Sequence, residues 1–310
     1  MKKLISIVTP TFNEEKNIYS LSKEISEQMR TYDFDYEHII IDNASTDNTQ
    51  EVIKKLCFEN KRVKAIFNIK NFGHIRSPYY GILQAKGDAV ILLASDYQDP
   101  PELIGKLIEK WKKGCEVVLL RRISSRTNFI LEYIKLIFYR VLNLLSEIKF
   151  KGRTTGSGIF DKKIIDQLKK IDEPYPYFRG LIYEITNKVD TIDFNQPQRK
   201  YGQSKNNFYT LFDVAMLGII KHSKLPLRLM TIMGCVFSLI AFVIGIFFFI
   251  YKLLFWSSFE LGIAPLILGF FFGISFQILL LGIIGEYVGF ILTQVRKIPL
   301  VIEKEIINFD

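Results

Sequence analysis

Two long stretches without a charged residue constrain this chain more than any other feature. The first runs from Leu229 to Tyr251 and the second from Leu261 to Gly285. Each exceeds the ~20 apolar residues that an α-helix needs to cross a bilayer. The connector 252–260 is too short for a domain. The sequence therefore predicts a hairpin of two transmembrane helices, over residues 229–251 and 261–285.

The same stretches could instead form a pair of buried core helices. Their length disfavours this alternative, and so do Phe247–Phe249 and Phe270–Phe272, which leave little polar face. Several glycines lie in both stretches and would allow close packing within the hairpin or against a second copy of the chain. A homo-oligomer therefore stays open.

Basic residues concentrate outside the hairpin. They are Lys221, Lys224 and Arg228 before the first span and Arg296, Lys297 and Lys304 after the second, against Lys252 alone in the connector. Because basic flanks stay on the cytoplasmic side, we expect both termini in the cytoplasm and a multi-pass protein of the cytoplasmic membrane. The chain then divides into a cytoplasmic domain at 1–228, a hairpin region at 229–290 and a cytoplasmic tail at 291–310.

The part before the hairpin is strongly basic. Of the 41 Lys and Arg and the 32 Asp and Glu residues, 37 and 27 lie within the first 228 positions, which gives this part a formal charge of +10. An anionic membrane surface or a phosphorylated substrate explains that balance as well as nucleic acid would. Because no nucleic-acid-binding motif is present, we expect no nucleic-acid partner. The three cysteines lie far apart, which argues against a disulfide framework or a zinc site.

Strand-like and helix-like patterns alternate through the first 120 residues. The expected strands are Leu4–Thr9, Glu37–Ile41, Val63–Phe67, Ala89–Leu93 and Glu116–Leu120. The expected helices are Glu15–Met29, Asn48–Leu56, Ile75–Gln84 and Pro101–Lys112. This order is typical of an α/β fold with a mostly parallel, Rossmann-like sheet covered by helices.

Polar clusters follow three of these strands. They are Pro10–Glu15, Asp42–Thr49 and Ser95–Pro101. Ligands of open α/β sheets bind outside the carboxyl ends of the strands, so acids placed there suit a bound substrate. Helix capping is the alternative for Asn13, for Ser45 to Asp47, and for Asp99 before two prolines. We favour capping for Thr46 and Asp47, and function for Asp42, Asp96 and Gln98.

At these residues the chain resembles the family 2 glycosyltransferases of the GT-A fold, and in particular the polyprenyl-phosphate glycosyltransferases. The resemblance covers essentially the whole chain and rests on PTFNEEKNI, IDNASTDNT, NFGHIRSPYYGILQAKGDAV, SDYQDPPELI, TGSGIFD, YFRGL and RKYGQSKNNF, followed by the hairpin. It implies transfer of a hexose-type sugar, with inversion, from a UDP- or GDP-linked donor to a polyprenyl (undecaprenyl) phosphate. Such a product would serve cell-envelope glycosylation.

The resemblance also implies roles for individual residues. The nucleotide sugar is assigned to Pro10, Glu14, Asp42, Ser95 and Asp96. The divalent metal, Mg²⁺ or Mn²⁺, is assigned to Asp96 and Gln98. Residues 96 and 98 project to the same side of an extended segment, so their oxygens can converge on one hard cation.

Basic residues supply the remaining assignments. The acceptor phosphate is assigned to Arg122, Arg126, Arg179, Arg199, Lys200, Ser204 and Lys205. A solvated or lipid head-group contact is the alternative for each of them. Catalysis is assigned to Asp96, Arg122 and Arg199, which would act by positioning and electrostatics because a lipid phosphate is already an anionic nucleophile.

Other segments are expected to lie at the membrane or near the acceptor. We expect amphipathic interfacial helices at 128–150 and 208–220, with a buried core helix as the alternative for the first. Thr154–Asp161 is expected to form a flexible, glycine-rich turn near the acceptor. The loop Gln196–Lys205 is expected, by resemblance, to close over the phosphates.

Two residues depart from the family pattern. Ala94 replaces the first Asp of D-x-D-x-Q-D-P-P, and Asn43 replaces the second Asp of D-D-G-S-T-D-N. A changed donor explains this better than an inactive protein does. Three other functions stay open: a processive polysaccharide synthase, disfavoured by the two spans, a transferase acting on a protein or a lipid-linked glycan, and a catalytically silent membrane subunit.

Overall fold

The computed structural model describes residues 2–123, 152, 154–197, 217, 220–221, 225–255 and 263–309. The expected interfacial helix at 128–150 lies outside these residues, and so does 208–220 apart from residues 217 and 220.

An eight-stranded mixed sheet forms the centre of the described chain. Its strands are β1 (Leu4–Thr11), β2 (Asp35–Asp42), β3 (Val63–Asn68), β4 (Ala89–Leu92), β5 (Val117–Arg122), β6 (Thr154–Asp161), β7 (Val189–Phe194) and β8 (Glu303–Ile307), in the order β7-β5-β6-β4-β1-β2-β3-β8. Strands β1 to β4 are parallel, and β5 and β7 are parallel to each other. Strands β6 and β8 run antiparallel to their neighbours. The predicted α/β fold with a mostly parallel sheet is confirmed.

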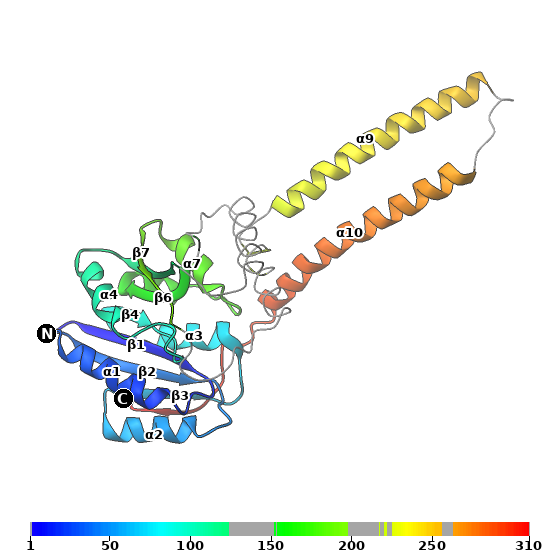
Figure 1. The fold of residues 1–310 in the computed structure, drawn as a ribbon. Coiled ribbons are helices and arrows are strands. Elements are labelled where there is room, and N and C mark those ends of the chain that lie inside the picture. The colour runs from blue at the N-terminus through cyan, green and yellow to red at the C-terminus, as the bar shows by residue number, and fades with distance from the viewer. Residues whose placement is uncertain are drawn as a thin grey trace.

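Helices cover both faces of the sheet (Figure 1). Helices α1 (Ile18–Arg30), α2 (Thr49–Glu59) and α4 (Leu103–Lys112) pack on one face, and α3 (Gly73–Gln84), α6 (Lys162–Leu168) and α7 (Phe178–Ile185) pack on the other. Alternate residues of each strand divide between two cores: Ile40 of β2 faces the first, and Ile39 and Ile41 face the second. Burial on both faces explains why the strands are apolar throughout.

The prediction of a flexible turn at Thr154–Asp161 is wrong. This segment is β6, which lies between β4 and β5 inside the sheet. A Cβ atom added to Gly158 would lie 2.1 Å from the carbonyl oxygen of Val118 on β5. The glycine therefore permits a close approach between two strands and is not a sign of flexibility.

The segment after the apolar helices returns to the sheet as β8, a strand that no local pattern in the sequence predicts. It pairs with β3, with Ile306 opposite Ile66. The Asn308 amide donates to the carbonyl oxygens of Cys57 at 2.9 Å and Val63 at 2.8 Å. Tyr80 donates to Glu303 over 2.7 Å. Residues on both sides of the apolar helices therefore belong to one folded domain.

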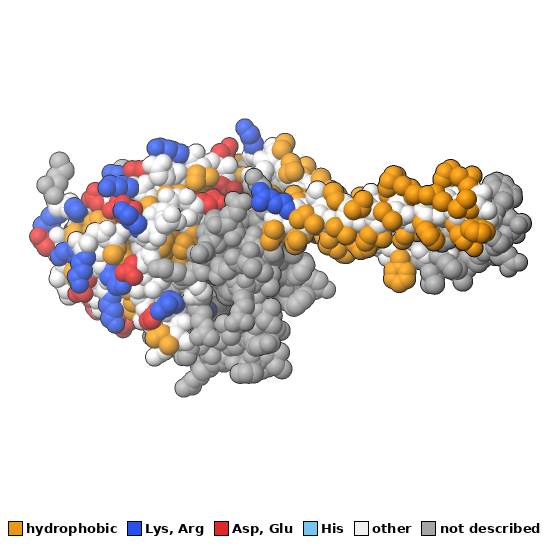
Figure 2. Space-filling view, turned by 90° about the horizontal axis from the view of Figure 1, so that it is seen from above, with side chains coloured by type: hydrophobic (Ala, Val, Ile, Leu, Met, Phe, Trp, Pro, Cys, Tyr) orange, Lys and Arg blue, Asp and Glu red, His pale blue; other side chains and the backbone are white. Residues whose placement is uncertain are grey.

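Two long helices, α9 (Leu225–Leu254) and α10 (Ile263–Val295), project side by side from this domain (Figure 1). The rings of Phe237 on α9 and Phe276 on α10 pack against each other, with their centroids 4.8 Å apart. Leu225–Tyr251 and Gly269–Val295 are long and apolar enough to cross a membrane, and neither is buried by the protein. Figure 2 shows hydrophobic side chains along the helices and mixed charges over the α/β domain. Helix α10 continues ten residues beyond Gly285, where the sequence pattern placed the end of the second span.

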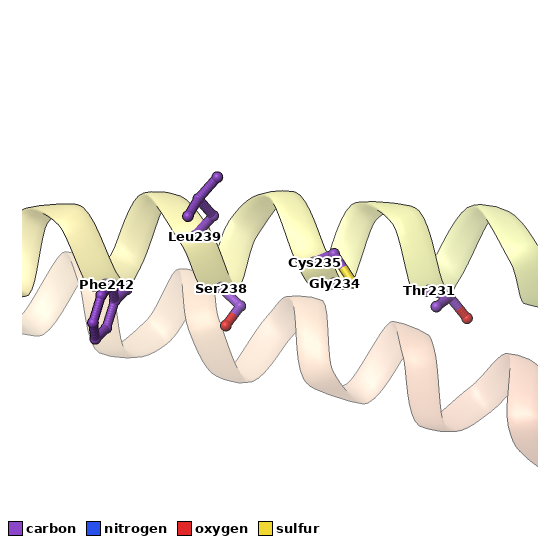
Figure 3. A pocket seen from close by; sticks show the side chains of 6 residues that line it. All are labelled: Thr231, Gly234, Cys235, Ser238, Leu239 and Phe242. Carbon is purple, nitrogen blue, oxygen red and sulfur yellow. The ribbon is translucent and has the colours of Figure 1, made fainter.

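A shallow pocket of about 560 Å³ lies on α9. Its lining is Thr231, Gly234, Cys235, Ser238, Leu239 and Phe242 (Figure 3). Ser238 and Phe242 extend on the side of α10 in this view, and Leu239 extends on the opposite side. The pocket belongs to the apolar helix pair, remote from the acidic residues of the sheet edge, so we assign it no chemistry.

His38 on β2 gives the fold an expected pH dependence. Its ring is buried between Thr9 Oγ1 at 3.0 Å and Ser22 Oγ at 3.1 Å, and burial lowers its pKa to about 3. Below pH ~6.5 the histidine is protonated in the unfolded chain but stays neutral in the folded chain. The free energy of unfolding should therefore decrease as the pH is lowered, by up to about 1.4 kcal/mol per pH unit. Thermal unfolding in detergent between pH 7.5 and 5 measures this loss. In His38→Gln the stability should depend less steeply on pH than in the parent. Equal dependence in the two proteins would contradict the role of His38.

Candidate active site

Loops after β1 and β2 are joined by hydrogen bonds at the carboxyl edge of the sheet. The Asn13 backbone N–H donates to Ser45 Oγ, and the Thr46 backbone N–H donates to the side-chain oxygen Oδ1 of Asn13, both at 2.8 Å. The Glu14 N–H donates to Thr49 Oγ1 at 2.8 Å. These contacts bring the two polar clusters of the sequence together as one surface.

Pro10 and Glu14 occupy the first of these loops. Pro10 is half-buried near the end of β1. The Glu14 carboxylate accepts a hydrogen bond of 2.6 Å from the Asn17 side chain at the start of α1. In the second loop, Asp47 Oδ1 accepts from the backbone of Thr49, the first residue of α2. Asn48 is the N-cap residue of α2, so the capping interpretation of Thr46 and Asp47 is wrong, although Asp47 bonds the first backbone N–H of the helix.

Asp42 is completely buried at the end of β2. Its carboxylate accepts hydrogen bonds from the Ser45 backbone at 3.0 Å, from the Ser45 hydroxyl, and from the Gln50 side chain at 2.8 Å. Burial raises the pKa of Asp42, and these hydrogen bonds oppose that rise. The carboxylate thus shapes the loop after β2, and its contact with a nucleotide stays a prediction.

Asn43 uses all parts of its side-chain amide. Its Nδ2 donates to Asn71 Oδ1 at 2.9 Å and to the Gly73 carbonyl at 3.2 Å. Its Oδ1 accepts from the Phe72 backbone at 2.9 Å and from Asn68 at 3.2 Å. An aspartate offers no donor, so the departure from the family pattern has a structural reason here.

We expect Asn43→Asp to loosen the segment between β3 and α3. The new carboxylate would face the Asn71 and Gly73 oxygens with no hydrogen to share, at a cost of about 1–3 kcal/mol. Thermal unfolding in detergent measures this loss, and hydrogen exchange at residues 68–73 locates it. Asp47→Asn, in the same loop, should leave both measurements nearly unchanged. Unchanged exchange in Asn43→Asp would contradict the assignment.

The acids after β4 lie in a turn, and the prediction of an extended segment there is wrong. Ser95 and Asp96 are 6% and 8% exposed. Tyr97 has a φ of 61°, and Asp96 Oδ1 accepts from the Gln98 backbone N–H at 3.1 Å. Aspartate commonly bonds the backbone two residues on and so stabilises a turn. Whether the Asp96 and Gln98 oxygens can bind one cation therefore depends on the geometry of the turn. It does not follow from the alternation of side chains along an extended strand.

Tyr97 attaches this turn to α1. Its hydroxyl donates to Glu24 Oε1 at 2.8 Å and also lies 3.0 Å from Ser20 Oγ. The positive φ of a bulky residue is unfavourable by itself, so such contacts help to hold it. Sequence reasoning missed Tyr97 because an aromatic residue between two polar ones gives no sign of a distant partner.

Asp99 connects the turn to β6. Its Oδ2 accepts from the Ala94 backbone at 3.2 Å and from the Ser157 hydroxyl. It is only 2% exposed, and burial raises its pKa, which Arg122 opposes and Asp96 reinforces. Glu102 is the N-cap residue of α4, so the capping interpretation of Asp99 is wrong. Sequence reasoning missed Ser157 because it assigned that segment to a turn.

Arginines approach the edge from both faces of the sheet. On β5, Arg121 is bound to Asp193 through two hydrogen bonds of 2.5 and 2.7 Å. Arg122 lies on the opposite face and contributes positive charge at Asp99. Burial lowers the pKa of the His74 imidazole on α3, and the positive charge of Arg179, at the start of α7, lowers it further.

The other residues predicted to bind the acceptor phosphate lie outside the described residues. They are Arg126, Arg199, Lys200, Ser204 and Lys205.

The donor set after β4 fits a divalent cation that is shared with a ligand. Within the described residues no group of three His, Cys, Asp or Glu side chains could hold a metal. Asp96 and Gln98 supply hard oxygen donors, a carboxylate and an amide. Mg²⁺ is usually held by one or two carboxylates together with substrate phosphates and water. The residues present are therefore sufficient only when a phosphate ligand completes the coordination.

The mostly parallel sheet with acids at its carboxyl edge has the architecture of the GT-A fold. The family model described as glycosyl transferase family 2 matches residues 6–169. The chain belongs to this family.

Full-length relatives agree with the family. The chain is 32% identical over 298 residues to an uncharacterized glycosyltransferase of Bacillus subtilis, covering 96% of this chain and 92% of the relative. It is 30% identical over 306 residues to a bactoprenol glucosyl transferase of Shigella phage SfII, covering 97% of each.

A solved structure shows the fold alone. Glucosyl-3-phosphoglycerate synthase from Mycobacterium tuberculosis, in complex with Mg²⁺ and UDP, is 16% identical with a TM-score of 0.52. The match covers 70% of this chain and 77% of that one.

Proposed function

We propose that this glycosyltransferase moves a sugar from a nucleotide diphosphate sugar to a polyprenyl phosphate, with inversion at the anomeric carbon. One observation carries the proposal: the same chain has oxygen donors at its sheet edge that suit a cation shared with a phosphate, and two exposed helices long enough to cross a membrane. A bactoprenol glucosyl transferase aligned over nearly the whole chain supports this acceptor class. UDP in the solved synthase supports a nucleotide diphosphate leaving group.

The reaction needs no strong general base. An oxygen of the lipid phosphate forms a bond to the anomeric carbon while the bond from that carbon to the nucleotide diphosphate breaks. The phosphate is already anionic, so no proton has to be removed from it. Residues near Pro10, Glu14, Asp42 and Ser95 would hold the donor, and Arg122 would offset negative charge at the reacting phosphates.

Asp96 and Gln98 would hold a divalent cation. When bound, it supplies Lewis-acid stabilisation of the departing diphosphate. The turn fixed by Tyr97 and Asp99 would keep these two oxygen donors in place before the substrate arrives.

The acceptor side would use basic groups. Arg179 lies at the start of α7, and Arg126, Arg199, Lys200, Ser204 and Lys205 are proposed from the sequence to join it. Both termini would lie in the cytoplasm, with α9 and α10 spanning the cytoplasmic membrane. The lipid phosphate would then be reached at the level of the head groups.

A donor screen tests this function. Purified full-length protein is incubated with undecaprenyl phosphate, Mg²⁺ and a panel of labelled UDP- and GDP-sugars. Lipid products are identified by mass spectrometry, and their anomeric configuration is determined by NMR. One donor should give a polyprenyl-phosphate sugar of inverted configuration. Absence of lipid product with every donor, beside an active relative as control, would exclude the proposal and favour a silent subunit.

A further inference from the structure

The apolar helix pair meets the α/β domain at a buried ion pair. Lys221 Nζ lies 2.8 Å from Glu173 Oε1, with the two side chains only 4% and 13% exposed. Glu173 lies in the loop between α6 and α7, and Lys221 lies shortly before α9. Breaking such a pair leaves an uncompensated buried charge, so each partner depends strongly on the other.

Helix α10 contacts the same carboxylate. Gln294, near its end, donates from Nε2 to Glu173 Oε1 at 2.7 Å. Lys221 also lies over the ring of Phe290, one turn earlier on α10, at 5.5 Å. The backbone carbonyl of Tyr175 accepts a further hydrogen bond from Lys221. A single carboxylate of the α/β domain therefore binds both Lys221, which precedes α9, and Gln294 of α10.

Glu173 lies on the loop that leads into α7, the helix that carries Arg179. Helix α7 begins five residues later at Phe178, and Arg179 is its second residue. Phe178 packs edge-on against Phe160 at 5.0 Å and near Tyr79 at 6.0 Å, which fixes the start of α7 on the sheet. Gln294 of α10 is thus connected to Arg179 through Glu173 and the short loop that leads into α7.

We propose that Glu173, Lys221 and Gln294 form a clamp that holds the helix pair against α7 and so sets the position of Arg179 relative to the membrane. This inference rests on the proposed function, because it requires a lipid acceptor and helices that span the bilayer. The three are positioning residues, since the clamp acts through Arg179. They would align the phosphate of a membrane-embedded acceptor with the donor.

Acceptor kinetics test the clamp. Lys221→Met is assayed as full-length protein in vesicles with undecaprenyl phosphate, and in detergent with a water-soluble short-chain isoprenyl phosphate. KM for undecaprenyl phosphate should rise about tenfold through misplacement, while donor KM and turnover with the short acceptor change less than about twofold. Lys221→Arg should restore the low KM.

Two matched variants separate positioning from simple instability. Glu173→Gln combined with Lys221→Met removes both buried charges, so stability should recover while KM for the long-chain acceptor stays high. Lys110→Met breaks a half-buried ion pair with Asp190 far from the helix pair and should change the KM of neither acceptor. Equal loss with both acceptors, or no change in KM, would overturn the clamp.

A distance measurement tests the clamp without any substrate. Spin labels are placed at Phe58→Cys on α2 and Leu281→Cys on α10, both exposed, after Cys57, Cys115 and Cys235 are replaced with alanine. The distance distribution should be narrow in the parent and broad in Lys221→Met. An unchanged width would overturn the clamp. If the parent transfers sugar to no lipid phosphate, the proposed function fails, whereas this measurement still decides whether the clamp exists.

Discussion

Replacing Asp96 with asparagine is expected to reduce sugar transfer by about 10³-fold, because metal-ion stabilisation of a departing diphosphate amounts to several kcal/mol. The variant should keep its fold, since an asparagine Oδ1 can still accept from the Gln98 backbone. Initial rates with the donor found in the screen measure the loss. Mn²⁺ binding followed by electron paramagnetic resonance should weaken in parallel.

Asp47→Asn is the matched control, the same chemical change in a loop on the same sheet edge. Asp47 bonds the start of α2, and asparagine can accept the same hydrogen bond, so its rate should stay within about twofold of the parent. Chelation with EDTA should stop the parent enzyme, and added Mg²⁺ should restore it. Full activity of Asp96→Asn in the presence of EDTA would remove the metal from the proposed mechanism.

Gly158→Ala is expected to destabilise the protein by about 3 kcal/mol or more, because the added Cβ would lie 2.1 Å from a backbone oxygen of β5. Backbone of a central strand cannot move aside as a side chain can. The melting temperature in detergent should fall by about 10 °C. The displaced β6 would also weaken the hydrogen bond from Ser157 to Asp99.

Gly156→Ala provides the control on the same strand. The nearest atom to its added Cβ would be Arg179 Nε at 3.9 Å, an ordinary contact. Its melting temperature should match that of the parent within about 2 °C. Equal melting temperatures for the two alanine variants would contradict the close packing of β5 and β6.

Local patterns predicted the elements well. Runs such as Ala89–Leu92 are apolar because both faces of the sheet are covered, and the amphipathic helices follow from their period. The two apolar helices likewise follow from composition and length. The positions of the acids at the strand ends followed from the order of the elements.

Pairings between distant segments could not be predicted in the same way. Strand β6 inserts antiparallel between β4 and β5, and β8 returns to β3 from the far end of the chain. In both cases the deciding interactions join residues that no local period connects. The glycines of Thr154–Asp161 predicted a flexible turn, whereas in the structure Gly158 lets β6 lie close to β5.

The sequence alone determined that this chain has an α/β domain with acids at its strand ends and two long apolar helices, because those properties depend on local periodicity and composition. Only the tertiary structure decided how the acids are held. Asp99 is bonded to Ser157, Tyr97 is bonded to Glu24, and Asn43 spans the loop before α3. Each is a contact between distant elements, and such contacts exist only once the sheet has assembled.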